Sequence, residues 1–181
     1  MKFRFPIFII DEDFRSENSS GLGIRAMAEA IENEGFEVVG VTSYGDLSQI
    51  AQQQSRASAF VLSIDDEEFS PGPDLDPAVL NLRQFIQEVR RKNEDVPIYL
   101  HGETKTSRHL PNDILRELHG FIHMFEDTPE FVARHIVHEA KKYLEGIQPP
   151  FFKALLDYAE DGSYSWHCPG HSGGVAFLKS P

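Results

Sequence analysis

The chain has 181 residues, of which 29 are acidic and 17 basic, and its formal net charge is -12. This charge repels a phosphate backbone, and the one basic cluster, Arg90 to Lys92, falls where a helix is expected to end, so the sequence argues against nucleic-acid binding. Hydrophobic residues at 40% and charged residues at 25% are typical of a globular protein and argue against a largely disordered chain.

The first part of the chain alternates apolar runs with amphipathic segments. Residues 5–11 form a compact apolar run that ends in acids, which is typical of a buried strand in a parallel sheet. Residues 20–34 carry apolar side chains at helical spacing before the stop signal of Gly35, which predicts an amphipathic helix. Residues 36–41 then indicate a second strand, and residues 44–57 a shorter and more polar helix.

The middle of the chain continues this alternation. Residues 59–65 form a third apolar run, which again ends in acids. Asp76 and Pro77 are an N-cap and N1 pair that predicts the start of a helix. Four apolar residues of that helix share one face: Val79, Leu82, Ile86 and Val89.

Two further strands and two helices complete the pattern. Residues 96–102 and 120–125 indicate the fourth and fifth strands, with a short helix over residues 111–118 between them. Thr128 and Pro129 predict the start of the last helix. Its inward positions are Val132, Ile136, Ala140 and Tyr143 or Leu144, and its expected end is marked by Lys141, Lys142 and Gly146.

Five strands alternating with five helices predict an α/β fold of the flavodoxin or receiver type. This is a doubly wound, five-stranded parallel sheet with right-handed crossovers. The break at Pro149 and Pro150 predicts a C-terminal linker segment after the sheet. We therefore expect one domain over residues 1–145 and a linker with the start of another region over residues 146–181.

Acidic residues follow the first and third predicted strands, where an open parallel sheet binds its ligands. Asp11, Glu12 and Asp65 are the candidate members of an acidic pocket, which resembles the site of response-regulator receiver domains that holds Mg²⁺ and accepts a phosphoryl group. A receiver also has a lysine directly after its fifth strand, and here Glu126 and Asp127 follow that strand. We therefore expect no metal here, and interpret these acids as solvated loop residues, some of which cap the next helix.

Other groupings of polar residues do not meet the requirements of a site. Gly21-Leu22-Gly23 comes too late after the first strand for a dinucleotide fingerprint. Cys168 with His167 and His171 offers too few sulfur and nitrogen ligands for structural zinc, which requires four. The same shortage of ligands argues against metal sites at His119 with His123 and at His135, His138 and Glu139.

The sequence predicts a cytoplasmic location without a membrane segment. The single cysteine, Cys168, cannot form an intrachain disulfide, and the N-terminal residues lack a signal peptide with a small-residue cleavage site. No apolar run approaches the roughly 20 residues that a membrane-spanning helix needs.

The end of the chain, SWHCPGHSGGVAFLKSP over residues 165–181, resembles the opening of the catalytic region of prokaryotic ornithine/lysine/arginine decarboxylases, which depend on pyridoxal phosphate. The order of the chain also matches that family: a receiver-like domain, a linker, and then Pro169-Gly170-His171 and Gly173-Gly174. The resemblance implies a non-catalytic N-terminal assembly and regulatory domain, often called the wing. The lysine that forms the Schiff base is expected beyond Pro181, and His167 and His171 are candidates to approach the cofactor region.

The resemblance also implies what the parent enzyme does. That enzyme would be a carboxy-lyase that converts a basic amino acid to its amine and carbon dioxide and consumes a proton, whereas the present segment alone is expected to catalyse nothing and to bind no cofactor. The implied partners are its own catalytic domain and further protomers, in the parent a decamer of dimers. Two alternatives remain: a receiver-type signalling domain that uses Asp11, Glu12 and Asp65, and a flavodoxin-like module that binds a flavin or nucleotide.

Overall fold

The structure is a computed structural model, and it describes residues 3–44, 57–64, 77–102, 110–123, 126–147, 166–167 and 175–176. The strands of the main sheet are β1 (Phe3–Ile10), β2 (Phe36–Val41), β3 (Ala59–Ser63), β4 (Ile98–Gly102) and β5 (Gly120–His123). The helices are the short 3-10 turn η1 (Glu12–Arg15), α1 (Ser19–Asn33), α3 (Pro77–Lys92), α5 (Asn112–Glu117) and α6 (Pro129–Ile147). Two short strands, β6 (Trp166–His167) and β7 (Val175–Ala176), form an antiparallel pair.

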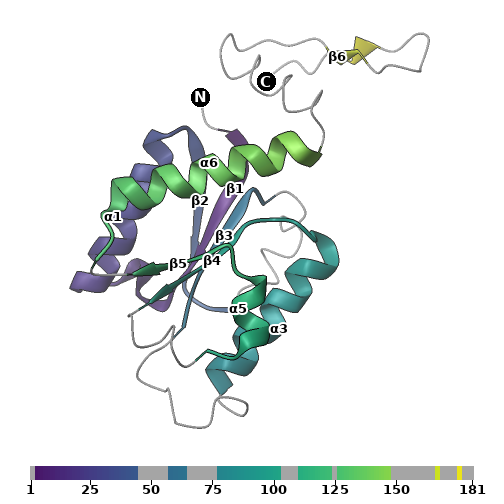
Figure 1. Ribbon diagram of the computed structural model, residues 1–181. Coiled ribbons are helices and arrows are strands. Elements are labelled where there is room, and N and C mark those ends of the chain that lie inside the picture. The colour runs from purple at the N-terminus through teal and green to yellow at the C-terminus, as the bar shows by residue number, and fades with distance from the viewer. Residues whose placement is uncertain are drawn as a thin grey trace.

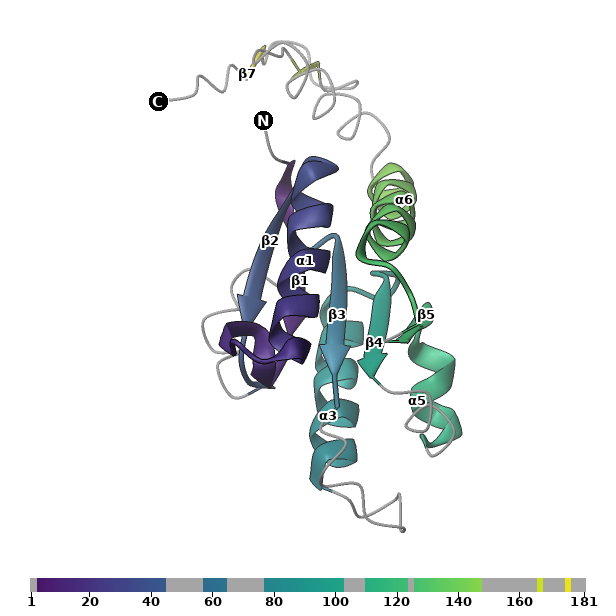
Figure 2. The same cartoon turned by 90° about the vertical axis from the view of Figure 1, so that its left-hand side faces the viewer.

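The five strands form one parallel sheet in the order β2-β1-β3-β4-β5. Figures 1 and 2 show α1 and α6 on one face of the sheet and α3 and α5 on the other. The predicted doubly wound α/β fold is therefore confirmed. Because every strand is parallel, all carboxyl ends lie along one edge of the sheet and all amino ends along the opposite edge.

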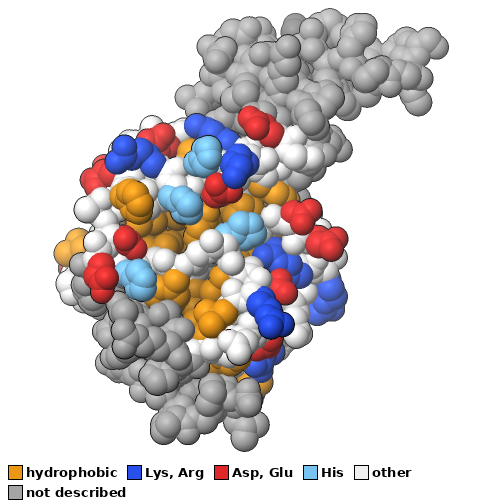
Figure 3. Space-filling model, viewed as in Figure 1, with side chains coloured by type: hydrophobic (Ala, Val, Ile, Leu, Met, Phe, Trp, Pro, Cys, Tyr) orange, Lys and Arg blue, Asp and Glu red, His pale blue; other side chains and the backbone are white. Residues whose placement is uncertain are grey.

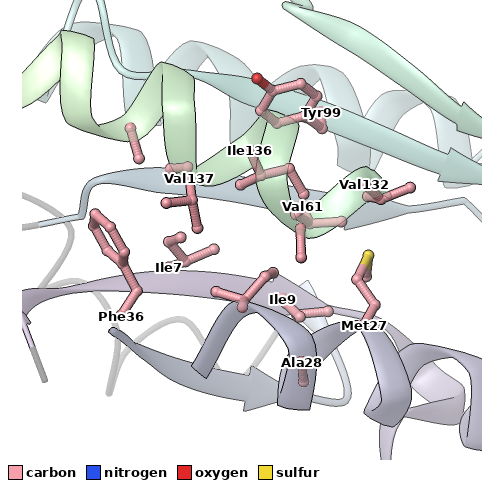
Figure 4. Close-up of a cluster of buried hydrophobic side chains, with 14 of the residues drawn as sticks. Ile7, Ile9, Met27, Ala28, Phe36, Val61, Tyr99, Val132, Ile136 and Val137 are labelled. Carbon is pink, nitrogen blue, oxygen red and sulfur yellow. The ribbon is translucent and has the colours of Figure 1, made fainter. Parts of the chain in front are cut away.

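The core consists of two apolar layers, one on each face of the sheet. Alternate residues of β1 divide between them: Ile7 and Ile9 belong to the layer under α1 and α6, and Phe8 and Ile10 to the layer under α3. Figure 4 shows the first layer, where Ile136 and Val137 of α6 meet the sheet. In the second layer the Phe60 ring stacks on Phe8 and meets Phe85 edge-on, with ring centroids 5.4 and 5.6 Å apart.

Most predicted helix positions are confirmed. The predicted inward face of α3 is buried, and so are Val132, Ile136, Ala140 and Leu144 of α6, while Tyr143 is half-buried. Helix α1 begins one residue earlier than predicted because Asn18 caps it, accepting a 2.7 Å hydrogen bond from the Gly21 N–H. Its predicted stop, Gly35, has a φ of 97°, a conformation that favours glycine.

Two expectations need a correction or stay open. Helix α6 runs to Ile147, so the predicted stop at Gly146 is wrong, because a glycine near the end of a helix is tolerated within it. The predicted helix over residues 44–57 falls almost wholly outside the described residues. The division into residues 1–145 and 146–181 stays a prediction.

Candidate functional site

A buried pair of polar side chains lies at the carboxyl edge of the sheet. Asp11 directly follows β1 and is 5% exposed, and His101 lies near the end of β4 and is 7% exposed. The His101 Nδ1 atom is 3.4 Å from Asp11 Oδ2. Since β3 lies between β1 and β4, the pair joins two strands across the end of the third.

Backbone contacts fix the position of Asp11 further. Its Oδ1 atom accepts a 2.8 Å hydrogen bond from the Asp13 N–H, which caps the η1 turn, and its own N–H donates to the Val41 carbonyl at 2.9 Å. The expectation of a solvated acid is therefore wrong for Asp11, although the expected capping is confirmed. The reason is that the chain turns back into η1 directly after β1 and covers the carboxylate.

The other two members of the predicted acidic pocket differ from Asp11. Glu12 is exposed at the start of η1, and Asp65 lies outside the described residues. Within the ranges that the structure describes, no group of three or more His, Cys, Asp or Glu side chains is arranged to hold a metal ion.

A cavity of about 360 Å³ opens beside Asp11. It lies among the ends of β1, β2 and β3 and the first turn of α3, which is the switch point where open α/β sheets bind ligands. The residues that line it are Ile10, Asp11, Glu12, Thr42, Ser43, Tyr44, Ser63, Ile64, Pro77, Ala78 and Asn81. None of these described lining residues carries a basic side chain.

Tyr44 closes one wall of the cavity. Its hydroxyl donates a hydrogen bond to the Ser63 carbonyl, and its ring lies 5.4 Å from that of Phe85, centroid to centroid. Burial, and secondarily the negative charge of Asp11, raises the pKa of the Tyr44 hydroxyl, which therefore stays protonated. The hydroxyl thus acts as a fixed hydrogen-bond donor that ties the loop after β2 to the end of β3.

Sequence reasoning included His101 in the predicted fourth strand, residues 96–102, but assigned no role to it. One signal did indicate that His101 is buried: it lies two residues after Tyr99, so the two side chains share a face of the strand. Ile9 and Asp11 are related in the same way at the end of β1 and face the same side. The pairing of Asp11 with His101 depended on the order of the strands, which this signal does not contain.

The histidines that the sequence considered as metal ligands lie in different places: His119 precedes β5 at the amino edge of the sheet, His123 ends β5 at the carboxyl edge, and His135 and His138 lie on α6. The His119 Nδ1 atom accepts a 3.4 Å hydrogen bond from the Ile98 N–H, and burial lowers the pKa of its ring. His135 lies edge-on to Tyr99 at 5.8 Å between ring centroids, and His138 Nε2 lies 3.8 Å from Glu139 Oε1. Figure 3 shows histidine, acidic and basic side chains interspersed on the face that carries α6.

The described residues do not fit pyridoxal phosphate. The cofactor needs a lysine for the Schiff base and an acid beside its ring nitrogen. Lys92 and Lys142 are exposed on α3 and α6, and Lys141 is partly exposed on α6. Lys142 lines a cavity with Asp95 and Glu139, but its Nζ atom already pairs with Glu139 Oε1 at 3.1 Å. His167 lies in β6, and His171 lies outside the described residues.

Comparison with protein families yields two consecutive matches. Residues 19–143 match the family described as "Orn/Lys/Arg decarboxylase, N-terminal domain", and residues 149–181 match "Orn/Lys/Arg decarboxylase, major domain". The chain is 31% identical over 182 aligned residues to a lysine decarboxylase of Pseudomonas aeruginosa, covering 98% of this chain and 23% of that protein. It is 29% identical to the biodegradative arginine decarboxylase of Escherichia coli, covering 97% of this chain and 22% of that protein. The chain thus spans about a quarter of the length of these curated relatives.

Solved structures give the same result. Lysine decarboxylase A from Pseudomonas aeruginosa matches with a TM-score of 0.69 and 27% identity, over 94% of this chain and 22% of that one. A response regulator receiver domain from Clostridium thermocellum matches with a TM-score of 0.53 over 76% of this chain and 94% of that one, but with 11% identity. The likeness to the receiver domain therefore shows the fold alone.

Proposed function

The chain belongs to the family of the Orn/Lys/Arg decarboxylase N-terminal domain, and from this premise we propose that it is the non-catalytic assembly and regulatory domain of a cytoplasmic, pyridoxal-phosphate-dependent decarboxylase. The parent enzyme takes lysine, arginine or ornithine, releases the carboxyl group as carbon dioxide, and places a proton on the carbon that carried it. The products are carbon dioxide and an amine.

The observation that carries the proposal is the order of the two family matches. The N-terminal domain match ends at residue 143 and the major domain match begins at residue 149, close to the end of α6 at Ile147. A receiver-like domain is thus followed almost directly by the start of the major domain. Because the described lysines do not fit the cofactor, we assign the chemistry to the major domain and assembly to the receiver-like domain.

The buried pair argues against the signalling alternative. A receiver needs carboxylates that are open to Mg²⁺ and a cation that meets the added phosphoryl charge. Here both carboxylate oxygens of Asp11 already have partners, Asp13 and His101. Past β5 the described chain continues with Glu126 and Asp127, and Asp127 accepts a 2.9 Å hydrogen bond from the His123 N–H.

The test is a decarboxylation assay on the complete polypeptide that carries this chain, with pyridoxal phosphate and with lysine, arginine and ornithine supplied separately. We expect carbon dioxide from at least one of the three amino acids. A matched variant that lacks residues 1–145 should retain the bound cofactor's absorbance but form a smaller oligomer, as measured by light scattering.

Three outcomes would contradict the proposal. Absence of carbon dioxide with all three amino acids would refute the decarboxylase assignment. An unchanged number of subunits after removal of residues 1–145 would refute the assembly role. Modification of Asp65 or Asp66 by acetyl phosphate with Mg²⁺ would favour the signalling alternative instead.

A further inference from the structure

A second cavity, of about 310 Å³, lies at the amino edge of the sheet. Asp95 and Pro97 of its lining come from the turn before β4, His119 directly precedes β5, and the C-terminal half of α6 supplies the rest. The volume lies within the range of roughly 300 to 1,000 Å³ that is usual for small-molecule pockets. We call this feature the amino-edge cavity.

The lining of the amino-edge cavity carries charges of both signs. Two carboxylates, Asp95 and Glu139, and one ammonium group, Lys142, line it. Burial lowers the pKa of His119, so its ring is neutral near pH 7. Two negative charges and one positive charge leave the lining with one net negative charge. A ligand with two positive groups and one negative group complements this pattern.

The polar groups of the lining keep capacity for a ligand. Lys142 Nζ lies 3.1 Å from both carboxylate oxygens of Glu139, but an ammonium has three N–H groups and a carboxylate about four acceptor positions. His119 Nδ1 accepts from the Ile98 N–H, so the neutral ring carries its proton on Nε2. Within the described ranges, neither this N–H nor the Asp95 carboxylate has a hydrogen-bond or ion-pair partner.

A buried hydroxyl beside this cavity is the second observation. The ring centroid of Tyr99 is 6.4 Å from that of His119, and burial, with the charge of Glu139 second, raises the pKa of the Tyr99 hydroxyl. Tyr99 is 1% exposed, and its hydroxyl has no hydrogen-bond partner in the described part of the chain. Because native structures seldom leave a buried polar group unsatisfied, this hydroxyl indicates a missing polar group next to the cavity, a ligand or the water that a ligand holds.

Other classes of ligand suit the amino-edge cavity less well. The two carboxylates repel a phosphate group, and Lys142 repels a ligand whose groups are all positive. A metal ion lacks ligands, because no group of three or more metal-binding side chains occurs in the ranges that the structure describes. The class that remains has both an anionic group and an excess of cationic ones.

We propose that the amino-edge cavity binds a basic α-amino acid, the substrate class of the parent enzyme, as a regulatory ligand. The choice of this class rests in part on the proposed function. Asp95 and Glu139 attract the two cationic groups, and Lys142 Nζ and the His119 Nε2–H donate to the α-carboxylate. The cavity reaches Gly146, three residues before the match to the major domain begins at residue 149, so the ligand binds close to the junction between the two domains.

The experiment is an NMR titration of the 181-residue chain with lysine, arginine and ornithine. Each is compared with its decarboxylated amine and with its form that lacks the α-amino group, which for lysine are 1,5-diaminopentane and 6-aminohexanoate. We expect saturable shifts of the His119 and Lys142 amides with at least one amino acid. Each of its two analogues should bind about three- to fivefold more weakly, the effect of losing one exposed charge contact. Absence of saturable shifts, or equal binding of either analogue, would overturn the proposal.

Three variants with matched controls separate this cavity from general attraction between charges. A Cβ atom at Gly146 meets nothing within 4 Å, and leucine favours a helix more than glycine does, so Gly146→Leu should fill the cavity, keep the fold and abolish binding. Asp95→Asn and Lys142→Met should each weaken binding about three- to fivefold. Glu94→Gln and Lys141→Met change the same charges outside the lining and should leave binding unchanged. Binding by Gly146→Leu at the affinity of the parent chain would show that the proposal is wrong.

The decarboxylation assay keeps the two proposals apart. Release of carbon dioxide by the complete polypeptide, together with no amino acid binding to the 181-residue chain, would refute the regulatory site and leave the proposed function standing. Saturable binding that Gly146→Leu abolishes, in a chain whose complete polypeptide releases no carbon dioxide, would support the site and refute the proposed function.

Discussion

Strand β4 carries a buried polar side chain near each end, and the two differ in whether the polar group has a partner. Near its carboxyl end, His101 is paired with Asp11. Near its amino end, Tyr99 is 1% exposed, and within the described part of the chain its hydroxyl has no hydrogen-bond partner. Tyr99 belongs to the layer under α1 and α6, and Figure 4 shows its hydroxyl directed away from the apolar cluster. The contact with Asp11 therefore helps to fix the position of His101, whereas the position of Tyr99 depends on the packing of its ring.

The surrounding charges differ as well. At the amino edge, Arg90 donates to the carbonyls of Val96 and Glu117 and to the Glu117 carboxylate, and Lys142 pairs with Glu139. At the carboxyl edge, the described lining of the cavity is acidic only. Charges of opposite sign thus compensate one another at the amino edge.

Breaking the buried pair should have the largest effect. His101→Leu leaves the Asp11 carboxylate buried beside an apolar side chain, and we expect a loss of about 2–4 kcal/mol in the free energy of unfolding. Urea denaturation measures this loss. His101→Gln, which keeps an N–H donor, should recover part of it. A loss below about 1 kcal/mol for His101→Leu would show that the pair is not important for stability.

The next largest effect is expected at Arg90. Its guanidinium donates at 2.8 Å to the Val96 carbonyl and at 2.7 Å to the Glu117 carbonyl, so it links α3, the start of β4 and the end of α5. Arg90→Met should cost about 1–3 kcal/mol in unfolding free energy. Lys142→Met is the control, because an exposed pair contributes less than about 1 kcal/mol. Equal losses in the two variants would contradict this ranking.

Removal of the Tyr99 hydroxyl should have the opposite sign. Tyr99→Phe deletes a buried polar group that has no partner among the described residues and should stabilise the protein by about 1 kcal/mol. In the control Tyr143→Phe, the deleted hydroxyl donates to Asn93 Oδ1, so a loss of about 1 kcal/mol is expected. Thermal melts of both variants check the signs, and destabilisation by Tyr99→Phe would disprove the contrast between the two ends of β4.

The smallest effect is a pH dependence at the amino edge. Burial, and secondarily the charge of Arg90, holds the pKa of His119 below its usual value, while Glu139 and Asp95 act in the opposite direction. The unfolded chain therefore takes up a proton first, so the stability contributed by neutral His119 is lost as the pH falls through about 6.5. Unfolding free energies of the parent and His119→Gln between about pH 8 and pH 5.5 should diverge, with the smaller slope in the variant. Parallel curves would exclude a role for His119.

Much of the fold could be predicted because apolar spacing reports directly on each element. Ile24, Met27, Ala28 and Ile31 lie at helical intervals and are buried along one side of α1. The short apolar runs with acids at their ends became the parallel strands. The family was also accessible, because the Gly-His end of the chain and the order of its parts are matched by the two decarboxylase family regions. These features depend only on residues near one another in sequence.

The site could be predicted only in part. The sequence indicated that acids collect at the carboxyl ends of the strands, and Asp11 and Glu12 do line the cavity there. It did not indicate that Asp11 is buried, that His101 pairs with it, or that Tyr99 lacks a partner. Asp11 and His101 are far apart in the chain. The alternation of apolar residues along a strand predicts which face of the sheet each side chain lies on, but not which residue of another strand it contacts.

The sequence by itself determined the elements, their class and the family, since hydrophobic period, capping residues and glycine positions act locally. The tertiary structure alone decided which polar groups meet. The order β2-β1-β3-β4-β5 places β1 and β4 on either side of β3, so that their carboxyl ends come within reach of each other. The physical reason is that burial makes an unpaired charge costly, while the choice of its partner depends on how whole strands are arranged.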